Sequence, residues 1–156
     1  MPFDRIRSRR KSTKKATTKP LILVIDDDPS ILRALEFKLK KKYNVRLCNS
    51  GKNGIERADE NVDVVILDIK MPGKDGLQVY EEIRAKLPRL PIIFYSAYQN
   101  LLEESELLDK HKPFGYLDKG VDYEKLLERI EKAIVRTDRM RKLAAATKMM
   151  KDTRSN

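Results

Sequence analysis

The stretch that organises this chain runs from Val62 to Gly76 and reads V-D-V-V-I-L-D-I-K-M-P-G-K-D-G. Its apolar run at 64–67 is bounded by polar and turn-forming residues, which is typical of a strand buried on both faces. Asp68 comes directly after that run and is followed by a loop that contains Pro and Gly. Because ligands bind outside the carboxyl ends of the strands in open α/β sheets, Asp68 is a candidate functional residue.

Further apolar runs and amphipathic segments alternate on both sides of this stretch. Each predicted strand is short and rich in apolar residues, and each predicted helix repeats apolar residues at helical spacing. The pattern predicts five strands alternating with five helices, which favours a parallel sheet covered by helices on both faces. The other strands are expected at Leu21–Ile25, Val45–Cys48, Pro91–Tyr95 and Phe114–Asp118, and the helices at Ile31–Leu39, Lys52–Glu60, Leu77–Leu87, Leu101–Leu108 and from Val121 onward.

The positive charge is concentrated at the two ends of the chain. The net charge is +10, with +7 in residues 1–20, −2 in residues 21–134 and +5 in residues 135–156. We therefore predict a disordered basic tail over 1–20, one domain over 21–135 and a basic helical extension over 136–156.

The number of cysteines and the length of the apolar runs indicate the cellular compartment of the protein. Cys48 is the single cysteine, so an intrachain disulfide is excluded, and the first apolar run spans only Leu21 to Ile25. A membrane span needs about 20 apolar residues. We expect a cytoplasmic protein with no membrane span. The single histidine, His111, lies between two lysines and is expected to be solvated, and no zinc site is predicted.

Polar residues follow four of the predicted strands. They are Asp26 and Asp27, Asp68, Ser96 and Lys119. In a parallel sheet these side chains meet at one edge, where clustered carboxylates repel each other unless a cation neutralises them. Mg²⁺ binds one or two carboxylates together with water and phosphate oxygens. With a lysine and a hydroxyl added, the set suits phosphoryl transfer, and a carboxylate can act as the nucleophile.

These residues resemble the receiver domain of two-component response regulators, of the single-domain chemotaxis-regulator type. The resemblance covers about residues 21 to 135 and rests on L-I-L-V-I-D-D-D-P-S, D-V-V-I-L-D-I-K-M-P-G-K-D-G, P-I-I-F-Y-S-A-Y and F-G-Y-L-D-K. It implies a flavodoxin-like, doubly wound sheet with strand order 2-1-3-4-5. It also implies that Asp68 is the phosphoacceptor and that Mg²⁺ is held by Asp26, Asp27, Asp68 and the backbone carbonyl of Lys70.

Three further residues receive roles from the same resemblance. Lys119 pairs with the phosphoryl group, Ser96 moves to bond it, and Tyr116 is the aromatic switch residue that then swings inward. One position departs from the family, because Gly120 follows Lys119 where the family usually has Pro. Three successive aspartates also allow Asp27 and Asp28 as the metal pair, but Asp26 and Asp27 directly follow the strand and are preferred.

The implied function is that of a stand-alone response regulator in a phosphorelay, which catalyses its own phosphorylation and dephosphorylation and is not a classical enzyme. A sensor histidine kinase or phosphotransfer protein would supply the phosphoryl group. A downstream protein would read the surface formed by the helix at 101–108, the strand at 114–118 and the helix from Val121. A homodimer through the last helix is a further hypothesis.

Two alternatives belong to other classes. An aspartate-nucleophile phosphohydrolase of the haloacid-dehalogenase type would use Asp26 as nucleophile and Asp28 as acid/base, because D-x-D follows the first strand. A scaffold would instead bind partners, or nucleic acid weakly, through the basic tails. Neither alternative explains the loop after Asp68.

Overall fold

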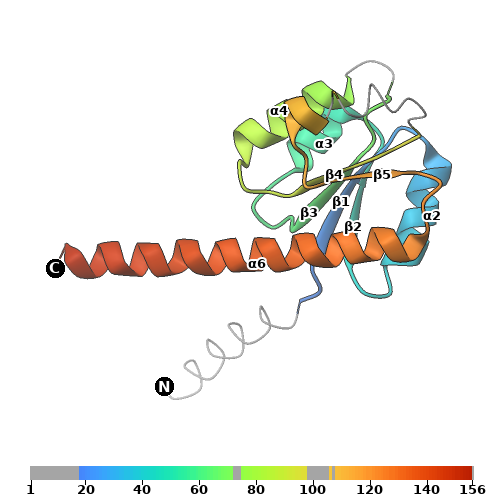
Figure 1. Ribbon diagram of the computed structural model, residues 1–156. Helices are drawn as coiled ribbons and strands as arrows, with labels where there is room; N and C mark the ends of the chain where they lie inside the picture. The colour runs from blue at the N-terminus through green and yellow to red at the C-terminus, as the bar shows by residue number, and fades with distance from the viewer. Residues whose placement is uncertain (1–17, 72–74, 98–105, 107, 156) are drawn as a thin grey trace, which may run out of the picture.

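The computed structural model describes residues 18–71, 75–97, 106 and 108–155, and within them five strands form one sheet that four labelled helices surround (Figure 1). Each labelled element begins within a few residues of the position that its hydropathy pattern predicts. The helix predicted at 101–108 and the basic tail predicted at 1–20 lie almost wholly outside the described residues. The strands are β1 (Leu21–Ile25), β2 (Asn44–Cys48), β3 (Val64–Leu67), β4 (Ile92–Ser96) and β5 (Gly115–Asp118). The helices are α2 (Pro29–Leu39), α3 (Gly51–Arg57), α4 (Gly76–Lys86) and α6 (Tyr123–Arg154), with residues 108–111 also helical.

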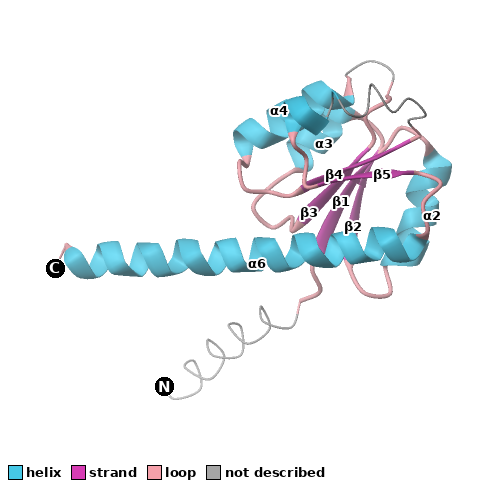
Figure 2. Ribbon diagram, in the orientation of Figure 1, coloured by secondary structure: helices cyan, strands magenta, loops and turns pink. Residues whose placement is uncertain are grey.

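The five strands form one parallel sheet in the order β2-β1-β3-β4-β5, which confirms the predicted fold (Figure 2). The inner strand β1 pairs with a neighbour on each side, so that Val24 lies between Leu47 and Ile66. All five strands therefore present their carboxyl ends at one edge. The order of the strands reverses between β1 and β3, which is where ligands bind in sheets of this kind.

Alternate residues of each strand serve two separate apolar layers. Ile22 and Val24 of β1 belong to the cluster that packs under α2 and α6. Leu23 and Ile25 belong to the cluster on the opposite face, under α3 and α4. The inner strands β1, β3 and β4 are covered on both faces and read as continuous apolar runs in the sequence, whereas the edge strands β2 and β5 are only partly buried.

The helix α3 ends three residues before the predicted Glu60. Ala58 leaves the helical conformation, and the Asp59 carboxylate accepts a hydrogen bond from the Asn61 N–H at 2.9 Å. The Arg46 guanidinium of β2 also binds the Arg57 carbonyl at 2.6 Å and the Asp59 carboxylate at 2.9 Å. These tertiary contacts stop the helix, and the hydropathy pattern does not contain them.

The helix α6 is much longer than the domain needs. Its buried residues lie in its first half, up to Thr137, whereas Leu143, Met149 and Met150 are exposed. Figure 1 shows the second half projecting away from the sheet, and the helix ends at Arg154, a few residues beyond Met150. None of the described helices combines the length and hydropathy required for a membrane crossing.

Asp63 anchors α6 to the amino end of the sheet. Its carboxylate accepts the Leu21 N–H at 2.7 Å and pairs with the Arg141 guanidinium at 2.5 Å. Its backbone carbonyl accepts a hydrogen bond from the buried Thr137 hydroxyl at 2.7 Å. One residue therefore joins the start of β1, the start of β3 and the point where α6 leaves the domain.

We expect Thr137→Val to lower the free energy of unfolding by about 1–2 kcal/mol, because the valine leaves the Asp63 carbonyl without its buried donor. Thr147→Val is the matched control. The Thr147 hydroxyl bonds to Leu143 within the exposed part of the same helix, so its loss should change stability very little. Urea unfolding followed by circular dichroism measures both variants, and equal effects would contradict this account of the anchor.

Candidate functional site

The carboxyl ends of four strands bring the predicted polar residues together. Asp26 and Asp27 follow β1, Asp68 follows β3, Ser96 closes β4 and Lys119 follows β5. The prediction that these side chains meet at one edge of the sheet is borne out by the distances between them.

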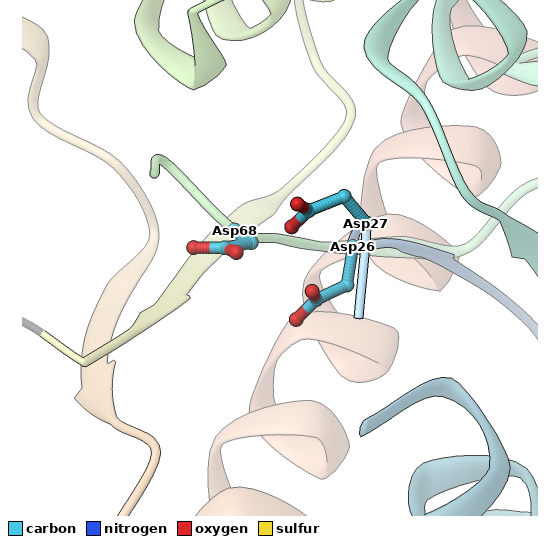
Figure 3. Close-up of side chains that lie close together, drawn as sticks. All are labelled: Asp26, Asp27 and Asp68. Atoms are coloured by element: carbon cyan, nitrogen blue, oxygen red, sulfur yellow. The ribbon is translucent and has the colours of Figure 1, made fainter. Parts of the chain in front are cut away.

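Three carboxylates form the centre of the site. One oxygen from each of Asp26, Asp27 and Asp68 lies within 4.8 Å of the others, and Figure 3 shows the side chains close together. Asp26 is 2% exposed and Asp68 is 3% exposed, whereas Asp27 faces solvent. Backbone N–H groups hold the two buried carboxylates in place, since Asp28 donates to Asp26 at 2.9 Å and Lys70 donates to Asp68 at 3.0 Å.

The Lys119 ammonium lies between the two buried carboxylates. Its Nζ is 2.8 Å from Asp26 Oδ2 and 3.2 Å from Asp68 Oδ2. Burial raises the pKa of Asp26, and the nearby charge of Asp68 adds to this, while Lys119 opposes it. Burial alone would lower the pKa of Lys119, but its bonds and charge interactions with both carboxylates raise it. The site therefore favours a charged lysine beside negative charge.

Ser96 completes the polar cluster. Its fully buried hydroxyl donates to Asp68 Oδ1 at 3.1 Å, the same oxygen that accepts the Lys70 N–H. The sequence-based mechanism had Ser96 moving toward this position after phosphorylation. In this structure the hydroxyl bonds the Asp68 carboxylate itself, so it would have to exchange this bond for one to a phosphoryl oxygen.

The three carboxylates fit a hard divalent cation. They supply only oxygen ligands, they come close enough to share one ion, and one of them faces solvent. Mg²⁺ is bound in this way, through one or two carboxylates with water in the remaining positions. A cation here also relieves the repulsion between Asp26 and Asp68.

Asp28 has a different role from its two neighbours. Its carboxylate accepts the Ser30 N–H at 2.9 Å and caps the start of α2. It is absent from the carboxylate group that the described residues form. The pair Asp26 and Asp27 is therefore the one that the fold assembles, and the Asp26/Asp28 arrangement that a haloacid-dehalogenase-type phosphohydrolase needs is not.

Comparison with known families agrees with this geometry. The family model for the response regulator receiver domain matches residues 22–131. This chain belongs to the response regulator receiver domain family. The match begins within β1, covers the other four strands and ends within α6.

Known relatives of this receiver domain include bacterial regulators and solved structures. The chain is 37% identical over 118 residues to the transcriptional regulatory protein ZraR of Escherichia coli K12, and this alignment covers 74% of the chain and 26% of ZraR. A receiver domain structure from Clostridium thermocellum has a TM-score of 0.70 and 32% identity, covering 78% of this chain and 98% of that one. A CheY-like receiver domain from Methanospirillum hungatei has a TM-score of 0.70 and 25% identity, covering 79% and 99%. The chain spans about a quarter of the length of the curated relatives it matches.

Tyr116, the predicted switch residue, lies on β5 beside Phe94 of β4 in the receiver sheet. Its ring packs against the apolar cluster under α3 and α4, and its hydroxyl is buried. The sequence-based mechanism expects Tyr116 to swing inward after phosphorylation, and that movement stays a prediction.

His111 contradicts the expectation of a solvated side chain. It is only 9% exposed, and its Nδ1 lies 2.7 Å from a carboxylate oxygen of Glu81 on α4. The buried Tyr80 hydroxyl donates to the His111 carbonyl at 2.5 Å and also bonds to Arg84. The flanking lysines suggested solvent exposure, but the contacts to α4 are separated by about thirty residues in sequence and leave no local signal.

Gly76 allows the start of α4 to lie close to the backbone that follows Asp68. A Cβ at this position would lie 2.2 Å from Ile69 Cα and 2.5 Å from the Asp68 carbonyl oxygen. We expect Gly76→Ala to lower the free energy of unfolding by about 2–3 kcal/mol, because the backbone after β3 must move. Urea unfolding measures this effect.

Gly115→Ala is the control for that variant, because its Cβ would meet only the flexible Arg129 side chain, with the nearest atom at 2.9 Å. A small change in stability is expected there. If Gly76→Ala were as stable as Gly115→Ala, the close approach of α4 to the Asp68 backbone would be refuted.

Proposed function

We propose that Asp68 accepts a phosphoryl group from a histidine kinase or phosphotransfer protein in a Mg²⁺-dependent reaction. The observation that supports this most strongly is the placement of Lys119 Nζ between Asp26 and Asp68 at the edge of a receiver sheet. Two buried carboxylates thereby lie next to a fixed positive charge. A fixed positive charge at this place stabilises the negative charge that a phosphoryl group brings to Asp68, which suits Asp68 as the nucleophile.

The chemical step exchanges one bond to phosphorus for another. A carboxylate oxygen of Asp68 attacks the phosphorus of a phosphohistidine, a P–O bond forms, and the P–N bond breaks. The imidazole leaves on the donor protein and takes up a proton. Asp26, Asp27, Asp68 and the Lys70 carbonyl would hold Mg²⁺, which when bound neutralises charge on the phosphoryl oxygens.

The other side chains position and stabilise the phosphoryl group. Lys119 pairs with a phosphoryl oxygen once Asp68 is phosphorylated, because its ammonium already lies 3.2 Å from the carboxylate. Ser96 donates its hydroxyl to another oxygen, which requires it to leave Asp68 Oδ1. Hydrolysis of the acyl phosphate in the same site ends the signal, so the chain would catalyse both its own phosphorylation and its dephosphorylation.

The proposed output is a change in the surface that includes the segment before β5, β5 itself and the start of α6. Ser96 and Tyr116 connect this surface to the site, because Ser96 pairs with Asp118 and Phe94 pairs with Tyr116 across adjacent strands. A phosphoryl group that binds Ser96 and Lys119 favours one of two arrangements of these residues. A downstream protein would then bind that arrangement.

Uptake of a phosphoryl group from acetyl phosphate tests the proposal. The protein should gain one phosphoryl group in the presence of Mg²⁺ and none after chelation with EDTA, as measured by intact-protein mass spectrometry. A pull-down with and without beryllofluoride then tests the output, since a partner of the switched surface should bind only the beryllofluoride form. Partner binding that is insensitive to beryllofluoride would favour the scaffold alternative.

A further inference from the structure

The turn that carries Lys119 also contains Gly120, which gives the backbone of the turn little rigidity. Lys119 lies between the end of β5 at Asp118 and the start of α6 at Tyr123, and Gly120 follows it directly. Glycine has the greatest backbone freedom of any residue, so it does not by itself fix the direction of the lysine. Nevertheless the ammonium is placed within 2.8 Å of one carboxylate and 3.2 Å of another.

Backbone hydrogen bonds attach both sides of this turn. The Lys119 N–H donates to the Ser96 carbonyl at 3.2 Å, which continues the pairing of β4 with β5. The Val121 N–H donates to the Asp118 carbonyl at 2.9 Å and closes the turn. Neither bond restrains the Lys119 carbonyl or the Gly120 N–H, which are the groups nearest to the flexible glycine.

Two side chains restrain those remaining groups. The Tyr95 hydroxyl donates to the Lys119 carbonyl at 3.3 Å. The Asp118 carboxylate accepts the Gly120 N–H at 2.7 Å. Together they hold the peptide group between Lys119 and Gly120 at its oxygen and at its nitrogen.

Tyr95 is well placed to act as a rigid support. It precedes Ser96 on β4, only 9% of it is exposed, and its ring packs in the apolar cluster under α2 and α6. Because successive strand residues point to opposite faces, Tyr95 and Ser96 leave the strand in different directions. The two neighbours thus contact the turn and Asp68 separately.

We infer that Tyr95 and Asp118 are positioning residues that fix the peptide after Lys119 and thereby hold its ammonium between Asp26 and Asp68. The inference rests on the proposed function, because the consequence of losing this support is slower phosphoryl uptake at Asp68. Neither residue touches the reacting atoms. Both act through Lys119, and their contribution is the placement of one positive charge.

Three variants separate this role from a general effect on stability. Tyr95→Phe removes the hydroxyl and keeps the packed ring, and Asp118→Ala removes the acceptor for the Gly120 N–H. Asp118→Asn keeps an acceptor oxygen and removes the charge. Tyr123→Phe is the matched control, because the Tyr123 hydroxyl also donates to a lysine carbonyl, that of Lys38 at 2.7 Å, but away from the site.

The full chain is assayed for its rate of phosphoryl uptake from acetyl phosphate, for beryllofluoride affinity with Mg²⁺, and for Mg²⁺ affinity alone by calorimetry. Tyr95→Phe and Asp118→Ala should each lower the uptake rate and the beryllofluoride affinity by about threefold to tenfold. Mg²⁺ affinity should not fall in either variant, because the carboxylates are untouched. Asp118→Asn and Tyr123→Phe should behave as wild type.

The outcomes distinguish the inference from the proposed function. A wild-type chain that takes up no phosphoryl group would overturn the proposed function itself. A wild-type chain that is phosphorylated while Tyr95→Phe and Asp118→Ala react at the same rate would overturn the inference alone. A loss in Asp118→Asn equal to that in Asp118→Ala would also overturn it, because the charge and not the hydrogen bond would then matter.

Discussion

Lys119→Met is expected to slow phosphoryl uptake by at least about 100-fold and to lower the free energy of unfolding by about 2–4 kcal/mol without Mg²⁺. Methionine keeps the length of the side chain but removes the ammonium that lies between Asp26 and Asp68. Two buried carboxylates would then face each other without a fixed cation. Stopped-flow uptake and urea unfolding measure the two effects.

The same substitution should strengthen Mg²⁺ binding. The lysine and the metal compete for the same carboxylates, so removal of the lysine leaves more negative charge for the ion. Lys142→Met is the matched control, because Lys142 pairs with Asp138 on the exposed part of α6. It should leave uptake, stability and Mg²⁺ affinity unchanged. Equal Mg²⁺ affinity in wild type and Lys119→Met would contradict the proposed competition.

Asp68→Asn is expected to abolish phosphoryl uptake while leaving the protein at least as stable as wild type. The asparagine has the shape of the aspartate and retains an oxygen for the Ser96 hydroxyl and the Lys70 N–H. It removes one of two buried like charges, and Lys119 remains paired with Asp26 at 2.8 Å. We expect the free energy of unfolding to stay equal or to rise by about 1 kcal/mol.

Asp59→Asn makes the same chemical change outside the site. The Asp59 carboxylate is partly desolvated, but its bonds to Arg46 and Asn61 lower its pKa, so the charged form stabilises the folded state. This substitution should lower stability slightly and leave phosphoryl uptake intact. If Asp68→Asn were clearly less stable than Asp59→Asn, the repulsion attributed to Asp26 and Asp68 would be wrong.

Much of the fold was predictable because the inner strands β1, β3 and β4 are buried on both faces and are therefore continuous apolar runs. The shorter signals of β2 and β5 completed the alternation with helices, and the parallel sheet then required Asp26, Asp68, Ser96 and Lys119 to meet at one edge. Asp28 was also predictable as a helix cap from the Pro and Ser that follow it. These inferences depend on local sequence and on one general rule of sheet geometry.

The features that sequence analysis missed depend on contacts between distant residues. His111 is buried by Tyr80 and Glu81 of α4, and Asp63 is joined to α6 by Arg141 and Thr137. No periodicity or motif records such pairs. The support of Lys119 by Tyr95 was missed for the same reason. A tyrosine in an apolar strand is predicted to be a core residue, and the sequence does not show which group its hydroxyl bonds.

The most direct measurement of the central claim is the position of the phosphoryl group. The protein is treated with acetyl phosphate and Mg²⁺, the acyl phosphate is reduced with borohydride, and the peptides are sequenced by mass spectrometry. The account predicts conversion of Asp68, and of no other aspartate, to homoserine. Homoserine at Asp26, Asp27 or elsewhere, with Asp68 unmodified, would contradict it.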